Sequence, residues 1–280
     1  MFKKQSNIII ALLSVIFLFF TITGYAQQPN PKPINHTSKI TLASSSAIRP
    51  TAEKHIKVLA HQLKKEGFDI YSLINDPRFE LYDGIADRFR HSAEKKSPSL
   101  ESYKRILGFE AKQNKIVAFI KAHAKQLEKA EQKYDVPKYV ISAIIGIESD
   151  FGENAGNYNP FNTYVSMYVE NYRKEFAFNQ LKHLLTFVKN RNLDVFDLKS
   201  SYAGAMTFGQ FIPYSMNKWF IGNDILDMDN NIMSVANYLS HFKKRTGSIK
   251  KAVYRYNPST LYTKAVLDLA NVAKEKYKAS

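Results

Sequence analysis

Apolar residues recur at helical spacing along most of the chain. The clearest case covers 112–134, where Ile116, Ile120 and Leu127 fall on one face and lysines and glutamines fill the other. The same period predicts helices over 55–65, 103–109, 175–189, 231–243 and 261–276. Alternation typical of a strand is weak and confined to 68–73. The pattern therefore predicts a mainly α protein.

A further helix is expected between Pro137, which suits a first helical turn, and Gly152, a natural residue just past a helix end. Its apolar stripe includes Ile141 and Ile144, and seven residues after Ile141 the stripe continues with Glu148. One interpretation is that the helix end frays and the carboxylate reaches solvent or a basic side chain. The other is that burial raises the pKa of this carboxyl, which then acts as a general acid near neutral pH.

Three other segments have distinctive compositions. SYAGAMTFGQF surrounds Gln210 with small residues, which disfavour a helix and allow a ligand or another backbone to come close. NIMSVANYLSHF is helical and carries Tyr238, while RYNPSTLY makes Asn257 a candidate N-cap of a helix that starts at Pro258. Taken singly, these segments are interpreted as a packed turn, a core tyrosine and a cap.

Taken in order, IIGIESDFG, SYAGAMTFGQFIP, SVANYL and YNPSTLY resemble the lytic murein transglycosylase B family, and PRFELYDGI and YDVPKYVISAI extend the resemblance. It implies a lysozyme-like, α-rich catalytic domain over 51–280, with an additional helical subdomain over about 51–110. It also implies cleavage of the β-1,4 bond between N-acetylmuramic acid and N-acetylglucosamine in peptidoglycan, with formation of 1,6-anhydromuramic acid.

The resemblance implies that Glu148 is the sole catalytic acid and that five residues lie near the substrate: Ser201, Gln210, Tyr238, Tyr256 and Asn257. Tyr202 and Tyr254 are further candidates, since an aromatic face can cover a sugar. Ordinary glycosidases use two carboxyl groups. Asp150 and Glu153 point away from Glu148 and are expected to be solvated or to act as caps, so one carboxyl would serve as both acid and base.

Two departures from the family pattern concern loops. Thr207 follows Met206 where glycine is usual. The segment FIGNDILDMDNN lacks the ordered acidic ligands of the calcium loop that better-known members carry, and Asn230 stands where an acidic ligand is expected. We therefore expect no bound calcium, no other metal and no cofactor.

Residues 1–26 have the parts of a secretory signal: a basic start, an apolar run over 8–20, and small residues at Gly24 and Ala26. We expect cleavage after Ala26, with an uncleaved membrane anchor as the alternative. A Pro- and Ser-rich flexible leader is expected over 27–50. The sequence has no cysteine, which excludes disulfides and a lipid-modified cysteine. These features predict an exported, soluble periplasmic protein. The alternative is that the protein is secreted and acts on the wall of another cell.

The net charge of +15 becomes +13 when Lys3 and Lys4 are removed with the signal. Such a surplus favours a polyanionic partner or serves only solubility. Export disfavours nucleic acid, so we expect peptidoglycan strands as the partner of a monomer that contacts membrane only through an uncleaved signal segment. Two alternative functions stay open, a hydrolytic muramidase on the same fold and a catalytically silent peptidoglycan-binding protein.

Overall fold

The computed structural model describes residues 49–91, 97 and 99–280. The predicted signal and residues 27–48 of the predicted leader lie outside these residues. The helices have the following bounds: α1 (Arg49–Lys65), α2 (Tyr71–Ile74), α3 (Ile85–Arg90), α5 (Leu100–Ile106), α6 (Phe109–Ala122), α7 (Ala124–Tyr134), α8 (Lys138–Ser149), α9 (Pro160–Val169), α10 (Lys174–Arg191), the 3-10 helix η1 (Val195–Asp197), α11 (Pro213–Trp219), α12 (Met228–Thr246), α13 (Ile249–Tyr256) and α14 (Thr260–Lys278).

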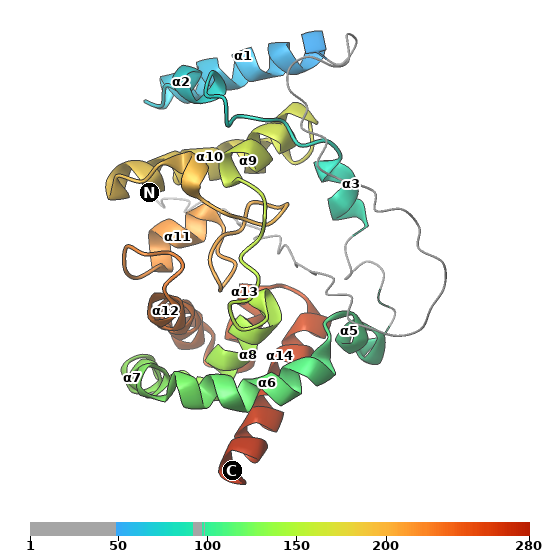
Figure 1. Cartoon of the computed structure of the whole chain (residues 1–280), viewed down its shortest axis with the longest axis vertical. Coiled ribbons are helices and arrows are strands. Elements are labelled where there is room, and N and C mark those ends of the chain that lie inside the picture. Colours follow the sequence, from blue (N-terminus) through green and yellow to red (C-terminus); the bar gives the residue numbers. More distant parts are fainter. Residues whose placement is uncertain (1–48, 92–96, 98) are drawn as a thin grey trace, which may run out of the picture.

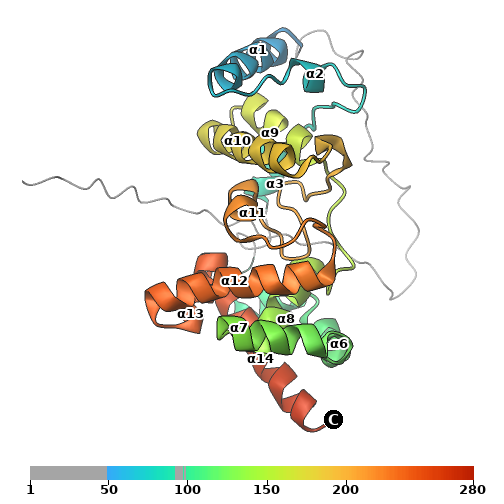
Figure 2. The same ribbon diagram turned by 90° about the vertical axis from the view of Figure 1, so that its left-hand side faces the viewer.

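The helices form two stacked groups, seen from two sides in Figures 1 and 2. In the upper group α1, α3 and α10 pack on α9, and in the lower group α6, α7, α12 and α14 pack around α8. The short helix α11 contacts both α10 and α12. The chain that follows α8 runs from the lower group to the upper one, so the end of α8 faces the junction (Figure 1).

The apolar pattern located most of these helices correctly. The helices predicted over 55–65, 175–189, 231–243 and 261–276 lie within α1, α10, α12 and α14. Their stripes are buried because they form the shared core, to which both groups contribute. The prediction of a mainly α fold is confirmed.

Two local predictions were wrong. The helix predicted over 112–134 is broken at His123 (φ −113°, ψ 23°), so it forms two helices that both contact α8, while α6 also packs on α14 and α7 packs mainly on α12. The weak strand predicted over 68–73 does not form. Ile70 is buried in the core and α2 begins at Tyr71, so the apolar residues of this segment serve a turn instead of a sheet.

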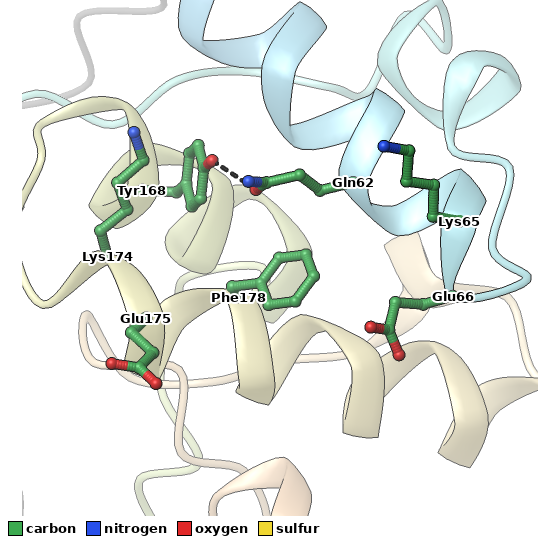
Figure 3. Close-up of a pocket in the computed structure, with 7 residues that line it drawn as sticks. All are labelled: Gln62, Lys65, Glu66, Tyr168, Lys174, Glu175 and Phe178. Atoms are coloured by element: carbon green, nitrogen blue, oxygen red, sulfur yellow. Dashed lines mark hydrogen bonds between the residues drawn. The ribbon is translucent and has the colours of Figure 1, made fainter.

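The helices α1, α9 and α10 line an open pocket of about 600 Å³ (Figure 3). These helices lie at the end of the molecule distant from α8 (Figure 1). The Tyr168 hydroxyl donates to Gln62 Oε1 across the pocket at 2.8 Å, and Lys182 pairs with Glu66 at 3.2 Å beside it. None of the predicted site residues lines this pocket. These contacts attach α1 to the upper group.

A helix that crosses a bilayer needs about 20 consecutive, predominantly apolar residues. Over 49–91, 97 and 99–280, the structure contains no helix that meets this requirement.

A matched pair of leucines tests the core. Leu239 of α12 is fully buried, whereas Leu226 before that helix is 43% exposed. Because Leu239→Ala leaves a cavity between packed helices, we expect it to lower the free energy of unfolding by about 2–5 kcal/mol. Leu226→Ala should change it by less than about 0.5 kcal/mol. Urea unfolding measures both, and equal losses would contradict this assignment of the core.

Candidate active site

Glu148 lies in the last turn of α8 with its side chain buried. It is 6% exposed, and Ile141, Ile144 and Ile145 of its stripe are fully buried. The hydroxyl of Tyr262, on α14, donates a hydrogen bond to Glu148 Oε1 at 2.6 Å. The interpretation in which this helix end frays into solvent is therefore wrong.

The end of α8 is fixed by its own backbone. Asp150 has left-handed geometry (φ 51°), and its N–H donates to the carbonyl of Gly146 at 3.1 Å. The N–H of Phe151 and the hydroxyl of Ser149 both donate to the carbonyl of Ile145. The Phe151 ring lies 2.5 Å from where a Cβ on residue 146 would be, which explains why a glycine interrupts this helix. The turn that carries Glu148 is consequently held in one geometry.

Two lysines of α6 add ion pairs to this turn. Asp150 lies 2.9 Å from Lys112 and 2.9 Å from Lys115, and Lys115 also contacts Glu153 at 2.8 Å. Burial raises the pKa of Asp150, but the hydrogen bonds from Lys115 and Lys112 outweigh it, so the pKa lies below its usual value of 3.8. Asp150 caps the helix and Glu153 is exposed, as expected from the sequence.

The segment 201–211, which we name the glutamine turn, is irregular, as its small residues predicted. The Ser201 hydroxyl donates to the carbonyl of Ala205 and accepts from its N–H, both at 3.2 Å, so the buried serine closes the first half. Thr207 and Gln210 have positive φ values, 71° and 52°. Such geometry is unfavourable for a β-branched residue, and Thr207 is fully buried.

Gln210 Oε1 and Asn257 Oδ1 are two of the three buried amide oxygens that have no hydrogen-bond partner among the described residues, the third being Asn162 Oδ1 of α9. The other end of the Gln210 amide is held in place, because Nε2 donates to the carbonyl of Thr207 at 2.9 Å. Buried polar atoms are normally hydrogen-bonded, so an unpaired acceptor calls for a partner. Gln210 and Asn257 were both predicted from the sequence as substrate contacts.

Tyr256 and Tyr238 connect the glutamine turn to α12 and α13. The Tyr256 hydroxyl donates to the carbonyl of Gly209 at 2.5 Å, and that of Tyr238 donates to the carbonyl of Arg255 at 2.6 Å. Their ring centroids are 4.8 Å apart. Burial, and then the charge of Glu148, raise the pKa of Tyr256 well above its usual range. Tyr256 is thus close enough to Glu148 for their charges to interact, and Tyr262 bonds Glu148 directly.

One predicted role changes in the structure. Asn257 was expected to be an N-cap, but it follows α13 as its C-cap. Ser259 caps α14 instead, because its hydroxyl accepts from the N–H of Tyr262 at 3.2 Å. Tyr202 is half-buried and lies edge-on to Phe89 of α3, with ring centroids 5.3 Å apart.

The sequence interpretation missed Tyr262. It is the last letter of YNPSTLY and is fully buried, on the same stripe of α14 as Val266 and Leu269. Helical spacing alone therefore classifies it as a core tyrosine. Only the packing of α14 against α8 brings its hydroxyl to Glu148.

Comparison with known proteins identifies the family. Residues 51–253 match the family model described as Transglycosylase SLT domain. The chain belongs to this family. It is 26% identical to the membrane-bound lytic murein transglycosylase B of Escherichia coli strain K12 over 270 residues, which covers 85% of this chain and 72% of that protein.

Solved structures of this transglycosylase family share the fold. The soluble lytic transglycosylase SltB1 of Pseudomonas aeruginosa is 22% identical and aligns over 81% of this chain and 100% of its own, with a TM-score of 0.72. The lytic transglycosylase Slt35 of Escherichia coli, in complex with calcium, is 21% identical and aligns over 81% and 94%, with a TM-score of 0.67. The predicted family resemblance and lysozyme-like fold are confirmed.

Asp150→Asn tests how the end of α8 is held. A carboxyl whose pKa is depressed by folding stabilises the protein above its unfolded pKa of about 3.9, and this contribution is lost as pH falls through the folded value. We therefore expect Asp150→Asn to lower the free energy of unfolding by about 1–3 kcal/mol at pH 7. The difference from wild type should shrink below pH 3.8.

Denaturant unfolding at several pH values measures this difference. Glu153→Gln is the control, because this carboxylate contacts the same Lys115 but is 59% exposed and should contribute little. A difference for Asp150→Asn that stays constant down to pH 2 would contradict the assignment.

Proposed function

We propose that this transglycosylase-family protein is a lytic transglycosylase of peptidoglycan in which Glu148 serves as both acid and base. The observation that carries the proposal is the buried Glu148 carboxyl, hydrogen-bonded to Tyr262 at the end of a rigid helix. Burial favours the protonated form of a carboxyl, which is the form that a general acid needs. The Escherichia coli relative is named a lytic murein transglycosylase, which supports murein as the substrate class.

One carboxyl is sufficient if the substrate supplies the nucleophile. Glu148 donates its proton to the glycosidic oxygen as the bond from that oxygen to C1 of N-acetylmuramic acid breaks. The resulting carboxylate then accepts the proton of the C6 hydroxyl of the same sugar, whose oxygen forms the new bond to C1. The tethered hydroxyl has a high effective concentration at C1, so it outcompetes water when it is oriented. The glutamate ends protonated, and no water is consumed.

The glutamine turn and Asn257 supply the polar contacts in this proposal. The unpaired Gln210 Oε1 and Asn257 Oδ1 are acceptors suited to a sugar hydroxyl or an N-acetyl N–H. The Tyr256 hydroxyl holds the turn at Gly209, the Tyr238 hydroxyl bonds the carbonyl of Arg255 on α13, and Ser201 maintains the shape of the turn from inside. Tyr202 presents an aromatic surface at the junction with α3.

The proposed place of action follows from the substrate. Peptidoglycan lies outside the cytoplasmic membrane, and residues 1–26 have the pattern of a secretory signal. We therefore propose that the mature protein acts in the periplasm, as a monomer without a cofactor.

Glu148→Gln tests the proposed chemistry. The amide cannot transfer a proton, so the variant should release no soluble muropeptides from purified sacculi while it still sediments with them. Wild type should release products one water lighter than hydrolysed muropeptides, as measured by mass spectrometry. Glu153→Gln, the same change on an exposed residue, should keep wild-type activity.

Three results would count against the proposal. Products of hydrolysed mass would identify a muramidase, and a wild type that binds sacculi without cleaving them would identify a silent binding protein. Release of muropeptides by Glu148→Gln would mean that another residue is the acid.

Tyr262→Phe tests how Glu148 is held. Removing the hydroxyl deletes the 2.6 Å hydrogen bond to Oε1 and leaves the ring packing in place. A hydrogen bond to a charged or catalytic carboxyl contributes about 1.5–3 kcal/mol, so kcat should fall about 10- to 100-fold with little change in KM. Tyr168→Phe is the control, since that hydroxyl bonds Gln62 in the upper group. Equal kinetics for the two variants would exclude a role for Tyr262.

A further inference from the structure

The loop between α11 and α12, residues 220–227, lies in the segment that the family resemblance matches to a calcium loop, and a solved structure of Slt35 is in complex with calcium. Calcium requires six to eight oxygen ligands directed at one point. Among the described residues, no three acidic or histidine side chains are grouped to hold a metal ion. The acidic side chains of this loop serve its backbone instead, because Asp224 Oδ1 accepts from the N–H of Leu226 and Asp227 Oδ1 from that of Asn230.

Three backbone oxygens of the loop also accept hydrogen bonds from side chains. Asn231 Nδ2 donates to the carbonyls of Ile225 at 3.0 Å and Asp227 at 2.8 Å. Asn230 Nδ2 donates to the carbonyl of Asp224 at 3.0 Å. These three carbonyls thus accept from side-chain amides, and no cluster of carboxylates among the described residues accompanies them, so this donor set does not fit calcium.

Asn231 also reaches the glutamine turn. Its Oδ1 accepts from the N–H of Phe208 at 2.9 Å and from that of Gly209 at 3.2 Å. An amide side chain has two donor hydrogens and two acceptor positions, and Asn231 uses all four while fully buried. If the amide were flipped, its NH2 group would face the N–H groups of 208 and 209, and its oxygen would face the carbonyls of 225 and 227. The hydrogen-bond network therefore determines the orientation of the amide.

We infer that Asn231 replaces a divalent cation in this loop, and that it is a positioning residue for Gln210. By joining the carbonyls of 225 and 227 to the N–H groups of 208 and 209, it fixes the turn directly before Gln210. The carbonyl of Gly209 also accepts from the hydroxyl of Tyr256, whose pKa is raised in part by the charge of Glu148. The bonds of Asn231 to the turn are therefore connected to Glu148 through Gly209 and Tyr256. The role assigned to Gln210 rests on the proposed function, whereas cation independence does not.

Close packing around Asn230 supports this interpretation of the loop. Gly222 has a positive φ of 90°, and a Cβ there would lie 2.3 Å from the Asn230 side chain. The Ser234 hydroxyl donates to the carbonyl of Asn230 and accepts from the N–H of Ile221. The first turns of α12 therefore bond the loop with the neutral side chains of Asn230, Asn231 and Ser234.

The test compares wild type, Asn231→Ala and Asn231→Asp, with Asn230→Ala as the matched control. Each protein is unfolded thermally with excess CaCl2 or with EDTA, and muropeptide release is timed well below the lowest Tm. We expect wild type and Asn230→Ala to have the same Tm in both buffers. Asn231→Ala should have a lower Tm in both, and its kcat should fall about 10- to 100-fold with KM changed less, because Gln210 is displaced.

In Asn231→Asp, one carboxylate oxygen can still accept from the N–H groups of 208 and 209. The other oxygen replaces the NH2 group and faces the carbonyls of 225 and 227. These oxygens repel one another without a cation and are suitable ligands with one. This variant should therefore lose Tm in EDTA and regain part of it in CaCl2, which wild type should not do.

Two outcomes would overturn the inference. A wild-type Tm that rises with CaCl2 or falls with EDTA would show that the loop binds a cation. A folded Asn231→Ala with kcat within twofold of wild type would show that Asn231 does not position Gln210. The product mass tests the proposed function separately, since relative rates can be compared whichever product forms.

Discussion

The hydrogen bond from Tyr262 to Glu148 is the contact on which the site depends. It joins α14 to the end of α8 at 2.6 Å, inside a core where both side chains are almost fully removed from water. A carboxyl in this position is unfavourable unless the surrounding structure fixes and satisfies it. The left-handed turn after α8 and the ion pairs of Asp150 hold the helix end, so the carboxyl cannot relax toward solvent.

The second part of the site is held by uncharged hydrogen bonds. The glutamine turn has little regular structure, and two of its non-glycine residues have positive φ values. Contacts from other elements therefore determine its shape, those of Tyr256 with Gly209 and of Asn231 with Phe208 and Gly209. In this way α12 and α13 hold the turn directly before Gln210, and unfavourable backbone geometry is retained at Thr207 and Gln210.

Sequence periodicity predicted the features that arise from burial on one helix. It located most helices and placed Glu148 on an apolar stripe, because a 3.6-residue repeat records which face is covered. It did not predict the break at His123, the cap at Ser259 or the partner of Glu148. These depend on contacts between elements far apart in the chain, and a buried tyrosine such as Tyr262 has the same pattern whether or not its hydroxyl meets a carboxyl. The residue that best illustrates this is Asn231, an ordinary polar residue in sequence that makes four hydrogen bonds once the loops meet.

In the proposed mechanism, one carboxyl completes the reaction with the substrate's own hydroxyl in place of water. Digestion of sacculi in water enriched in oxygen-18 tests it most directly. The account predicts that muropeptides released by wild type contain no oxygen-18 at C1 of the muramic acid, because the oxygen bound there comes from C6 of the same sugar. Incorporation of one oxygen-18 per cleaved bond would show that water is the nucleophile and would contradict the account.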